Sequence, residues 1–124
     1  DRIRPNSNIL MKSVLYLVSK KASLTANETV DMMLVSGVFE QPCSVVFIDD
    51  GVYQLFGDMM LVRTKDTSRA LSALPTYGID RLYADNQSLY ERNLQFASCH
   101  LSFQTIDASE ITQLFNEHDI VVTD

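Results

Sequence analysis

The sequence predicts an α/β protein, a three-layer α/β/α sandwich built around a mostly parallel five-stranded sheet. Several short segments are continuously apolar rather than alternating, as expected for strands that are buried on both faces. Helical patterns separate these segments, and this alternation is typical of parallel sheets with crossover helices. The chain has 124 residues, 46% of them hydrophobic and 21% charged, which favours one globular domain.

The first half of the chain predicts a strand, a helix and a second strand. Residues 13–19 are an apolar run interpreted as a buried strand. Thr25 and Glu28 have the spacing of a capping box, in which each side chain satisfies a free backbone N–H group. An apolar helical stripe follows and ends before Pro42. Residues 43–48 are interpreted as the second buried strand.

Two helical segments and a strand are expected next. A short helical segment is expected over residues 52–56, and a longer helix over residues 66–74. Pro75 and Gly78 are expected to end the longer helix, because neither residue continues a helix readily. Residues 81–84 then form the third expected strand.

The last third repeats this alternation. Ser88 and Glu91 have capping-box spacing, which predicts a helix over residues 88–93, and residues 101–106 are the fourth expected strand.

A final helix and strand complete the expected sheet. Asp107 and Glu110 fit a further capping box, and Ile106 with Ile111 fits its hydrophobic staple. Residues 120–122 are the last expected strand.

Charge and apolar patterning exclude several classes of function. Ten basic and sixteen acidic residues give a net charge of −6, so direct nucleic-acid binding is not expected. The longest apolar runs are far shorter than the ~20 residues that span a bilayer, so no membrane association is expected. With no secretory pattern, a cytoplasmic location is expected.

Residues 1–10 are interpreted as an extension before Met11, and residues 11–124 as the domain.

The carboxyl ends of the first two strands are candidate ligand sites, because ligands collect at the carboxyl ends of parallel strands. The hydroxyls of residues 19–25 resemble a flavin phosphate loop, but no glycine allows close backbone approach, which favours an ordinary loop. Asp49 and Asp50 could hold Mg²⁺. The alternative is that Asp50 caps the next helix while Gly51 eases the turn. No metal or cofactor is expected.

Two cysteines are candidate nucleophiles. Cys43 opens a buried strand, which favours a structural thiol. Cys99 lies in a loop beside His100, but adjacency in sequence does not make a catalytic pair. The other histidine, His118, does not cluster with the cysteines at metal-ligand spacing. Asp85 and Ser88 follow the third strand, where they are good helix caps but offer no nucleophilic sulfur.

A nine-residue stretch resembles a known family. Residues 47–55, Phe-Ile-Asp-Asp-Gly-Val-Tyr-Gln-Leu, are similar to the F-I-x-D-G-V-x-Q-L segment of the TusC/DsrF subunits of the DsrE/DsrF/DsrH (TusBCD) sulfur-relay family. Looser similarity runs from Met11 to Asp124. The resemblance implies a parallel α/β/α sandwich, in agreement with the periodicity.

The resemblance also implies partners and a role. The chain would join a hetero-oligomer with a DsrE/TusD-like and a DsrH/TusB-like subunit. A cysteine of the DsrE/TusD-like subunit would carry the persulfide, destined in the Tus version for tRNA wobble-uridine 2-thiolation and in the Dsr version for sulfur oxidation. The matching position is Asp85, and a carboxylate cannot carry a persulfide. The chain is therefore expected to be a non-catalytic structural subunit.

The motif is expected to supply an interface as well as part of the core. Its residues are Asp50, Gly51, Val52, Tyr53, Gln54, Leu55 and Phe56, with Met59, Met60 and Leu61 beside them. Aromatic and methionine side chains suit protein contacts. A homo-oligomer is a further expectation for the isolated chain.

Two alternatives remain open: a sulfurtransferase that uses Cys99 itself, and a small-ligand module of flavodoxin or receiver type that is suggested by fold class alone.

Overall fold

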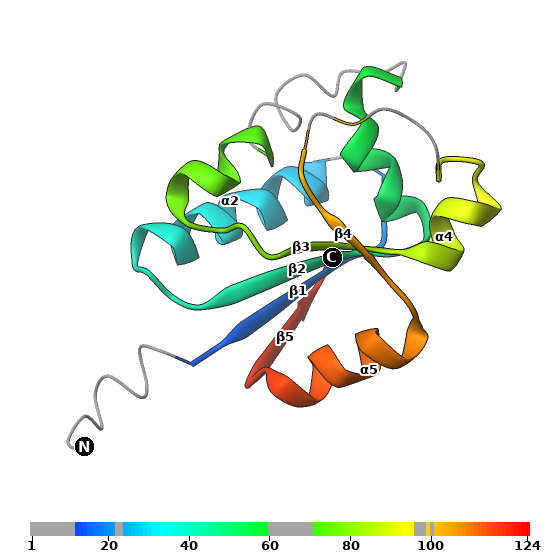
Figure 1. The fold of residues 1–124 in the computed structure, drawn as a ribbon. Coiled ribbons are helices and arrows are strands. Elements are labelled where there is room, and N and C mark those ends of the chain that lie inside the picture. The colour runs from blue at the N-terminus through cyan, green and yellow to red at the C-terminus, as the bar shows by residue number, and fades with distance from the viewer. Residues whose placement is uncertain (1–11, 22–23, 60–70, 96–98, 100) are drawn as a thin grey trace.

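The computed structural model describes residues 12–21, 24–59, 71–95, 99 and 101–124. Five strands form a single sheet in the order β4-β3-β2-β1-β5, and every neighbouring pair is parallel (Figure 1). The strands are β1 (Val14–Val18), β2 (Cys43–Phe47), β3 (Leu82–Asp85), β4 (Gln104–Ile106) and β5 (Ile120–Thr123). The helices are α2 (Leu24–Val38), η1 (Asp49–Met59), η2 (Leu74–Tyr77), α4 (Asn86–Glu91) and α5 (Ala108–Glu117), of which η1 and η2 are 3-10 helices. The predicted α/β class and parallel sheet are confirmed.

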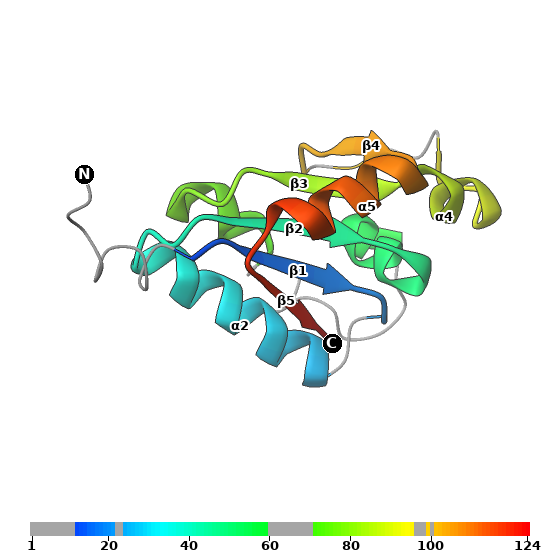
Figure 2. The same ribbon diagram turned by 90° about the horizontal axis from the view of Figure 1, so that it is seen from below.

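The sheet separates two hydrophobic cores of unequal size. Along β1, Val14, Tyr16 and Val18 point to one face, and Leu15 and Leu17 to the other, as the two-residue period of a strand requires. The first face packs against α2, η1, η2 and α4, whose apolar side chains join the larger core. Of the elements that the structure describes, only α5 packs against the second face (Figures 1 and 2).

The single helix α5 covers its face incompletely. None of its residues is buried, although Ile111 and Leu114 pack against the smaller core. Ile106 and Ile111 lie in that same core, which bears out the predicted hydrophobic staple. Leu17 and Ile48 stay only partly buried beneath this helix. An open hollow therefore remains beside α5.

Helix caps confirm one prediction and correct another. The capping box of Asp107 and Glu110 is present in full at the start of α5. The predicted cap at Ser88 is wrong, because the N-cap of α4 is Asp85, whose side chain accepts a hydrogen bond from the Ser88 backbone N–H. Ser88 is instead the third residue of the helix.

The other predicted helix boundaries move by a few residues. α2 starts at Leu24, so Thr25 lies within the first turn, and the side chains of residues 24–28 are not described. Residues 71–73 are α-helical and the α-helix ends just before Pro75, as expected, while Pro75 itself sits in the first turn of η2, where its fixed φ is favourable. Gly78 caps η2 with a left-handed φ of 83°, as predicted. Residues 66–70 of the expected helix lie outside the described residues.

The Asp107 cap predicts a loss of stability in acid. Hydrogen bonds, first of all from the Glu110 backbone N–H, lower the pKa of Asp107. A carboxyl whose pKa is lower in the folded state stabilises the fold above its unfolded pKa of ~3.9, and this is lost as the pH falls through the folded value. Urea unfolding at pH 6 and pH 3 is expected to give a smaller acid loss for Asp107→Asn, which keeps a capping oxygen but does not titrate. Equal acid losses in variant and wild type would contradict this.

Strand β5 is an open edge. Among the described strands it pairs with β1 alone, and Ile120 and Val121 are each 40% exposed. None of the helices in the described part of the chain is long and apolar enough to cross a membrane.

Candidate functional site

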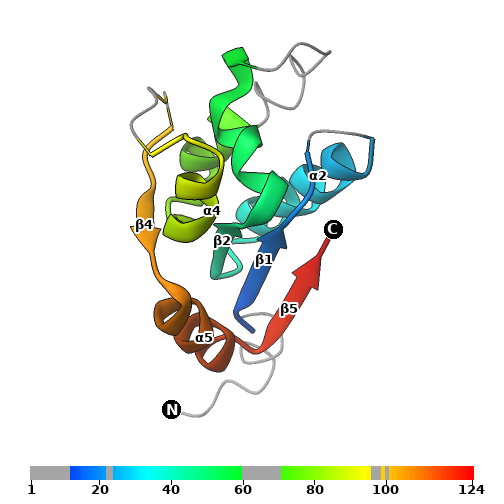
Figure 3. The same cartoon turned by 90° about the vertical axis from the view of Figure 1, so that its right-hand side faces the viewer.

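The carboxyl ends of the strands border a groove on the α5 side, with a volume of about 600 Å³. Figure 3 looks toward this edge of the sheet, with α4 above it and α5 below. The residues that line the groove are Leu17, Ile48, Asp49, Asp85, Asn86, Gln87, Asp107, Ala108, Ile111, Thr112 and Phe115. Its floor is thus aliphatic and aromatic, while three aspartates contribute carboxylates. We call it the carboxyl-edge groove.

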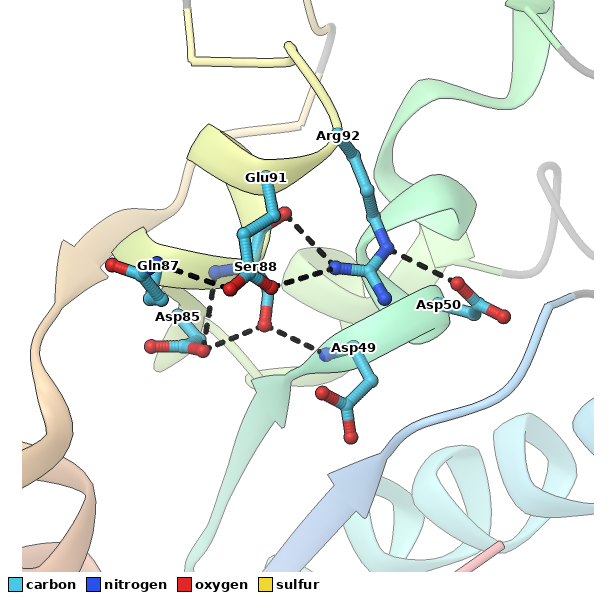
Figure 4. A network of polar contacts seen from close by, with 7 residues as sticks. All are labelled: Asp49, Asp50, Asp85, Gln87, Ser88, Glu91 and Arg92. Carbon is cyan, nitrogen blue, oxygen red and sulfur yellow. Dashed lines mark hydrogen bonds and ion pairs between the residues drawn. The ribbon is translucent and has the colours of Figure 1, made fainter.

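A polar network joins the ends of β2 and β3 above the groove (Figure 4). The Asp49 backbone N–H donates to the Ser88 hydroxyl at 2.8 Å, and that hydroxyl donates to Asp85 Oδ2 at 2.6 Å. The same Asp85 oxygen accepts the Ser88 backbone N–H at 3.2 Å. Ser88 is only 2% exposed, so its hydroxyl is a buried link between η1 and α4. The Asp85 carboxylate therefore holds the start of α4 in place.

Arg92 makes a second link between the same two helices. Its Nε donates to Asp50 Oδ1 at 3.1 Å, and its Nη1 donates to the Ser88 carbonyl at 3.2 Å. The Arg92 side chain is 19% exposed and that of Asp50 is 51% exposed. The carboxylate of Glu91 lies 3.7 Å from Arg92 Nη1 and also accepts from Gln87. The arginine thus ties α4 to the first turn of η1.

The paired aspartates at the end of β2 do not act together. The Asp50 side chain turns toward Arg92, while that of Asp49 points away from it (Figure 4). The predicted helix cap by Asp50 is wrong, because this residue lies inside the first turn of η1 and its carboxylate pairs with Arg92. Among the described residues, no group of three His, Cys, Asp or Glu side chains could hold a metal ion.

Gly51 is required for space rather than for its backbone angle. The positive φ in this turn, 49°, belongs to Asp49, so the predicted role of Gly51 in easing the turn is wrong. A Cβ atom on Gly51 would lie 2.0 Å from the Val18 carbonyl oxygen and 2.5 Å from its carbon. The start of η1 therefore lies directly against the end of β1, and no side chain fits between them.

Most of the recognised motif is core, which corrects the expected interface. Val52 and Leu55 are 0% exposed and Phe56 is 3% exposed, so these side chains have no surface to offer a partner. Tyr53 is partly buried, with Lys21 Nζ 5.2 Å from its ring centroid. The side chain of Met59, and Met60 and Leu61 altogether, lie outside what the structure describes.

Gln54 and Asp124 bind Ser19 and Lys20, at the start of the segment that resembles a flavin phosphate loop. Gln54 is 4% exposed and donates to the Lys20 carbonyl at 2.7 Å. The Asp124 carboxylate accepts from the backbone N–H groups of Ser19 and Lys20 and from the Ser19 hydroxyl. The N–H groups of Ser19 and Lys20 are therefore occupied by the chain's own carboxylate, which favours the ordinary-loop interpretation for this part of the segment.

The two thiols are protonated at neutral pH. Burial raises the pKa of Cys43 to about 11. Burial also raises the pKa of Cys99, whose Sγ donates to the Leu55 carbonyl at 2.8 Å. Both side chains pack against the larger core, away from the carboxyl-edge groove. Neither has the thiolate character that a sulfur-carrying cysteine needs. His100 lies outside the described residues.

One polar pair was missed by the sequence-based interpretation. His118 Nε2 lies 3.0 Å from the Ser44 hydroxyl, and Nδ1 lies 2.7 Å from the Leu114 carbonyl. The carbonyl can only accept, so Nδ1 carries a proton. Ser44 is 0% exposed, so its hydroxyl is closed to a substrate, and the pair anchors the end of α5 to β2. No local motif predicts it, because the two residues are 74 positions apart.

The fold is that of a small α/β protein with a parallel sheet. The described residues that line the carboxyl-edge groove carry carboxylate, amide and hydroxyl oxygens but no thiol. Residues 12–123 match the model of the DsrE/DsrF-like family. The chain belongs to this family.

Individual relatives agree with this assignment. The chain is 31% identical to the TusC homolog of Pseudomonas aeruginosa, with 91% of this chain and 99% of the relative covered. It is 30% identical to the intracellular sulfur oxidation protein DsrF of Allochromatium vinosum, with coverages of 90% and 96%. The crystal structure of the E. coli YchN protein superposes with a TM-score of 0.77 at 12% identity, covering 92% of this chain and 99% of that one, which shows a shared fold.

Proposed function

We propose that this chain is a non-catalytic structural subunit of a hetero-oligomeric sulfur-relay complex. Its partners would be a DsrE/TusD-like and a DsrH/TusB-like subunit, and the complex would pass persulfide sulfur toward tRNA wobble-uridine 2-thiolation in the cytoplasm. Membership of the DsrE/DsrF-like family supports the proposal, as do relatives of both the TusC and the DsrF kind.

The observation that carries the non-catalytic role is the part played by Asp85. By the family resemblance, this position at the end of β3 matches the persulfide-carrying cysteine of the sister subunit. Here it holds a carboxylate that caps α4 and accepts both the backbone N–H and the hydroxyl of Ser88. Oxygen cannot replace sulfur in persulfide exchange, which proceeds by thiolate attack on sulfur. Asp85 instead stabilises the start of α4.

Co-expression tests the quaternary part of the proposal. An affinity-tagged form of this chain is expected to co-purify with both sister subunits from its own organism. A matched control is the same tag on an unrelated protein of similar size. Retention of neither sister would contradict the proposal directly.

A thiol-free chain tests the non-catalytic part. Cys43→Ala combined with Cys99→Ser is expected to leave the rate of sulfur transfer by the assembled complex unchanged, because neither thiol is a thiolate at neutral pH. Serine at position 99 can still donate to the Leu55 carbonyl. The readout is isotopically labelled sulfur moved from a persulfide donor to the acceptor, with a sister subunit lacking its reactive cysteine as the inactive control. Loss of transfer together with a covalent sulfur adduct on Cys99 of the wild type would establish the sulfurtransferase alternative.

A DsrF-like role in sulfur oxidation is the second candidate, favoured by similarity to DsrF nearly equal to that to TusC. Gene deletion separates the two. Loss of 2-thiouridine from hydrolysed tRNA supports thiolation, whereas intact thiolation with impaired sulfur oxidation supports the second candidate.

A further inference from the structure

The carboxyl-edge groove has an apolar floor that stays open to solvent. Leu17 and Ile48 line it from the sheet, and Ile111 and Phe115 line it from α5. The first three are only partly buried, and Phe115 is 39% exposed. A volume of about 600 Å³ lies within the ~300–1,000 Å³ range of ligand sites, and ligands of parallel sheets bind at the carboxyl ends of the strands. The groove therefore has the place and size of a binding site.

The charged side chains of the groove are all acidic. Asp49, Asp85 and Asp107 contribute carboxylates, and none of the described lining residues is Lys, Arg or His. Arg92 makes both ion pairs found among the described residues, and neither involves these three aspartates. Residues 93–124 carry five acidic residues and no Lys or Arg, so the last quarter of the sequence does not balance the charge. The groove therefore attracts cations and repels anions.

Asp49 is the carboxylate most available to a ligand. Asp85 and Asp107 already accept hydrogen bonds as the N-caps of α4 and α5. Asp49 is exposed, and the network of Figure 4 reaches it through its backbone N–H rather than through its side chain. Its charge is therefore free to meet a cation that enters the groove.

An arginine side chain matches both the floor and the charge. Its apolar stem covers aliphatic surface while its charged head stays near water. The planar guanidinium stacks on aromatic rings, binds carboxylates through paired N–H donors, and is more weakly hydrated than the ammonium of lysine. The groove offers the guanidinium both an exposed ring, that of Phe115, and the carboxylate of Asp49.

The open shape of the groove favours an arginine that belongs to a protein over a free small molecule. None of the residues of α5 is buried, so the groove is open along this helix. Sites for small ligands bury ~70–90% of the ligand surface, which an open groove does not do. A side chain carried by a protein makes its remaining contacts outside the groove.

We propose that the carboxyl-edge groove binds an arginine of another protein, in a segment where apolar residues flank that arginine. The flanking side chains cover the floor at Leu17 and Ile48, and the guanidinium pairs with Asp49. This adds a binding site to the proposed function without depending on it.

A capped tripeptide tests the groove on the full chain. The probe is acetyl-Leu-Arg-Leu-amide, added to the isotopically labelled protein while its backbone amide signals are followed by NMR. With ~5 mM peptide, a dissociation constant of ~1 mM leaves most sites occupied, so weak binding is visible. Shifts are expected at groove residues, among them Asp49, Thr112 and Phe115. No shifts there, or shifts centred elsewhere, overturn the proposal.

Two further peptides separate the charge from the apolar contact. Citrulline in place of arginine keeps the shape without the charge, and it is expected to bind about 10-fold more weakly. Glycine in place of both leucines removes the apolar flanks and is expected to bind severalfold more weakly. Equal binding of the citrulline peptide means that no cation is recognised, and equal binding of the glycine peptide means that apolar flanks play no part. Either result overturns the proposal.

Matched variants locate the charge. Asp49→Asn removes the carboxylate, and asparagine tolerates the left-handed φ of 49° at this position. Binding of acetyl-Leu-Arg-Leu-amide is expected to weaken about 3-fold, a modest loss because the carboxylate is exposed. The control is Asp80→Asn, the same change of charge just before β3 begins, at the opposite end of the sheet. Circular dichroism melting checks that both variants fold. An equal loss in both means that only net charge matters, which overturns the proposal.

Sedimentation velocity separates another protein from a second copy of this chain. Copies that each carry a net charge of −6 repel one another, so no self-association through the groove is expected. Self-association that Asp49→Asn weakens and Asp80→Asn does not would make a second copy the occupant and overturn the proposal. Because each measurement uses the full chain alone, its outcome is separate from whether the sister subunits co-purify.

Discussion

Replacing Gly51 with alanine is expected to lower the free energy of unfolding by at least ~3 kcal/mol, as overpacking against rigid surroundings does at its upper range. The added Cβ would lie 2.0 Å from the Val18 carbonyl oxygen, which is backbone and cannot rotate aside. That carbonyl also accepts the Ile48 N–H at 2.9 Å, so moving it would strain the junction of β1 and β2. Urea unfolding measures the loss.

Gly78 supplies the matched control. A Cβ there would meet nothing within 4 Å, although the φ of 83° is left-handed. Gly78→Ala should therefore cost about 1–2 kcal/mol, the conformational penalty alone. A smaller loss for Gly51→Ala than for Gly78→Ala would show that η1 can move away from β1 without disturbing the sheet.

Ser88→Ala is expected to lower the free energy of unfolding by about 2 kcal/mol. The substitution removes the hydroxyl that accepts the Asp49 backbone N–H and donates to Asp85. A buried donor left without a partner costs about 1–3 kcal/mol. Alanine also favours helix more than serine, so helix propensity cannot cause the loss. Chemical denaturation at neutral pH gives the value.

Ser109→Ala is the counterpart at an exposed cap. The Ser109 hydroxyl also donates to a capping aspartate, Asp107, at 2.9 Å, but it lies in water. Its removal should change stability by no more than ~0.5 kcal/mol. If the two serines proved equivalent, the network above the carboxyl-edge groove would not be the rigid link that its burial indicates.

The strands were predictable from the sequence because continuous apolar runs mark burial on both faces. Val14–Val18 and the run that starts at Cys43 fall where β1 and β2 lie. The strand order was not predicted, because local patterns do not say which strands pair. The cap at Asp107 was found because the whole box lies within four residues. At α4 the same pattern was placed three residues late, since Ser88 and Asp85 are both good caps and only tertiary contacts choose between them.

The candidate site was harder to predict than the fold. The family resemblance singled out Asp85, at the carboxyl end of β3. It did not predict the contacts of nearby residues, because their partners are distant in the sequence. Asp50 pairs with Arg92, which lies 42 positions away. Gly51 looked like a turn residue, and only its distance to Val18 shows that it is a close-approach residue. Long-range packing of this kind leaves no periodic signature in one sequence.

The open edge at β5 has a consequence for the isolated chain. Its residues, Ile120 to Thr123, include no lysine or proline, and no other strand in the described part of the chain pairs with its outer side. Such an edge is a template with which a strand of another chain can pair. Overproduction of this chain by itself should therefore favour inclusion bodies.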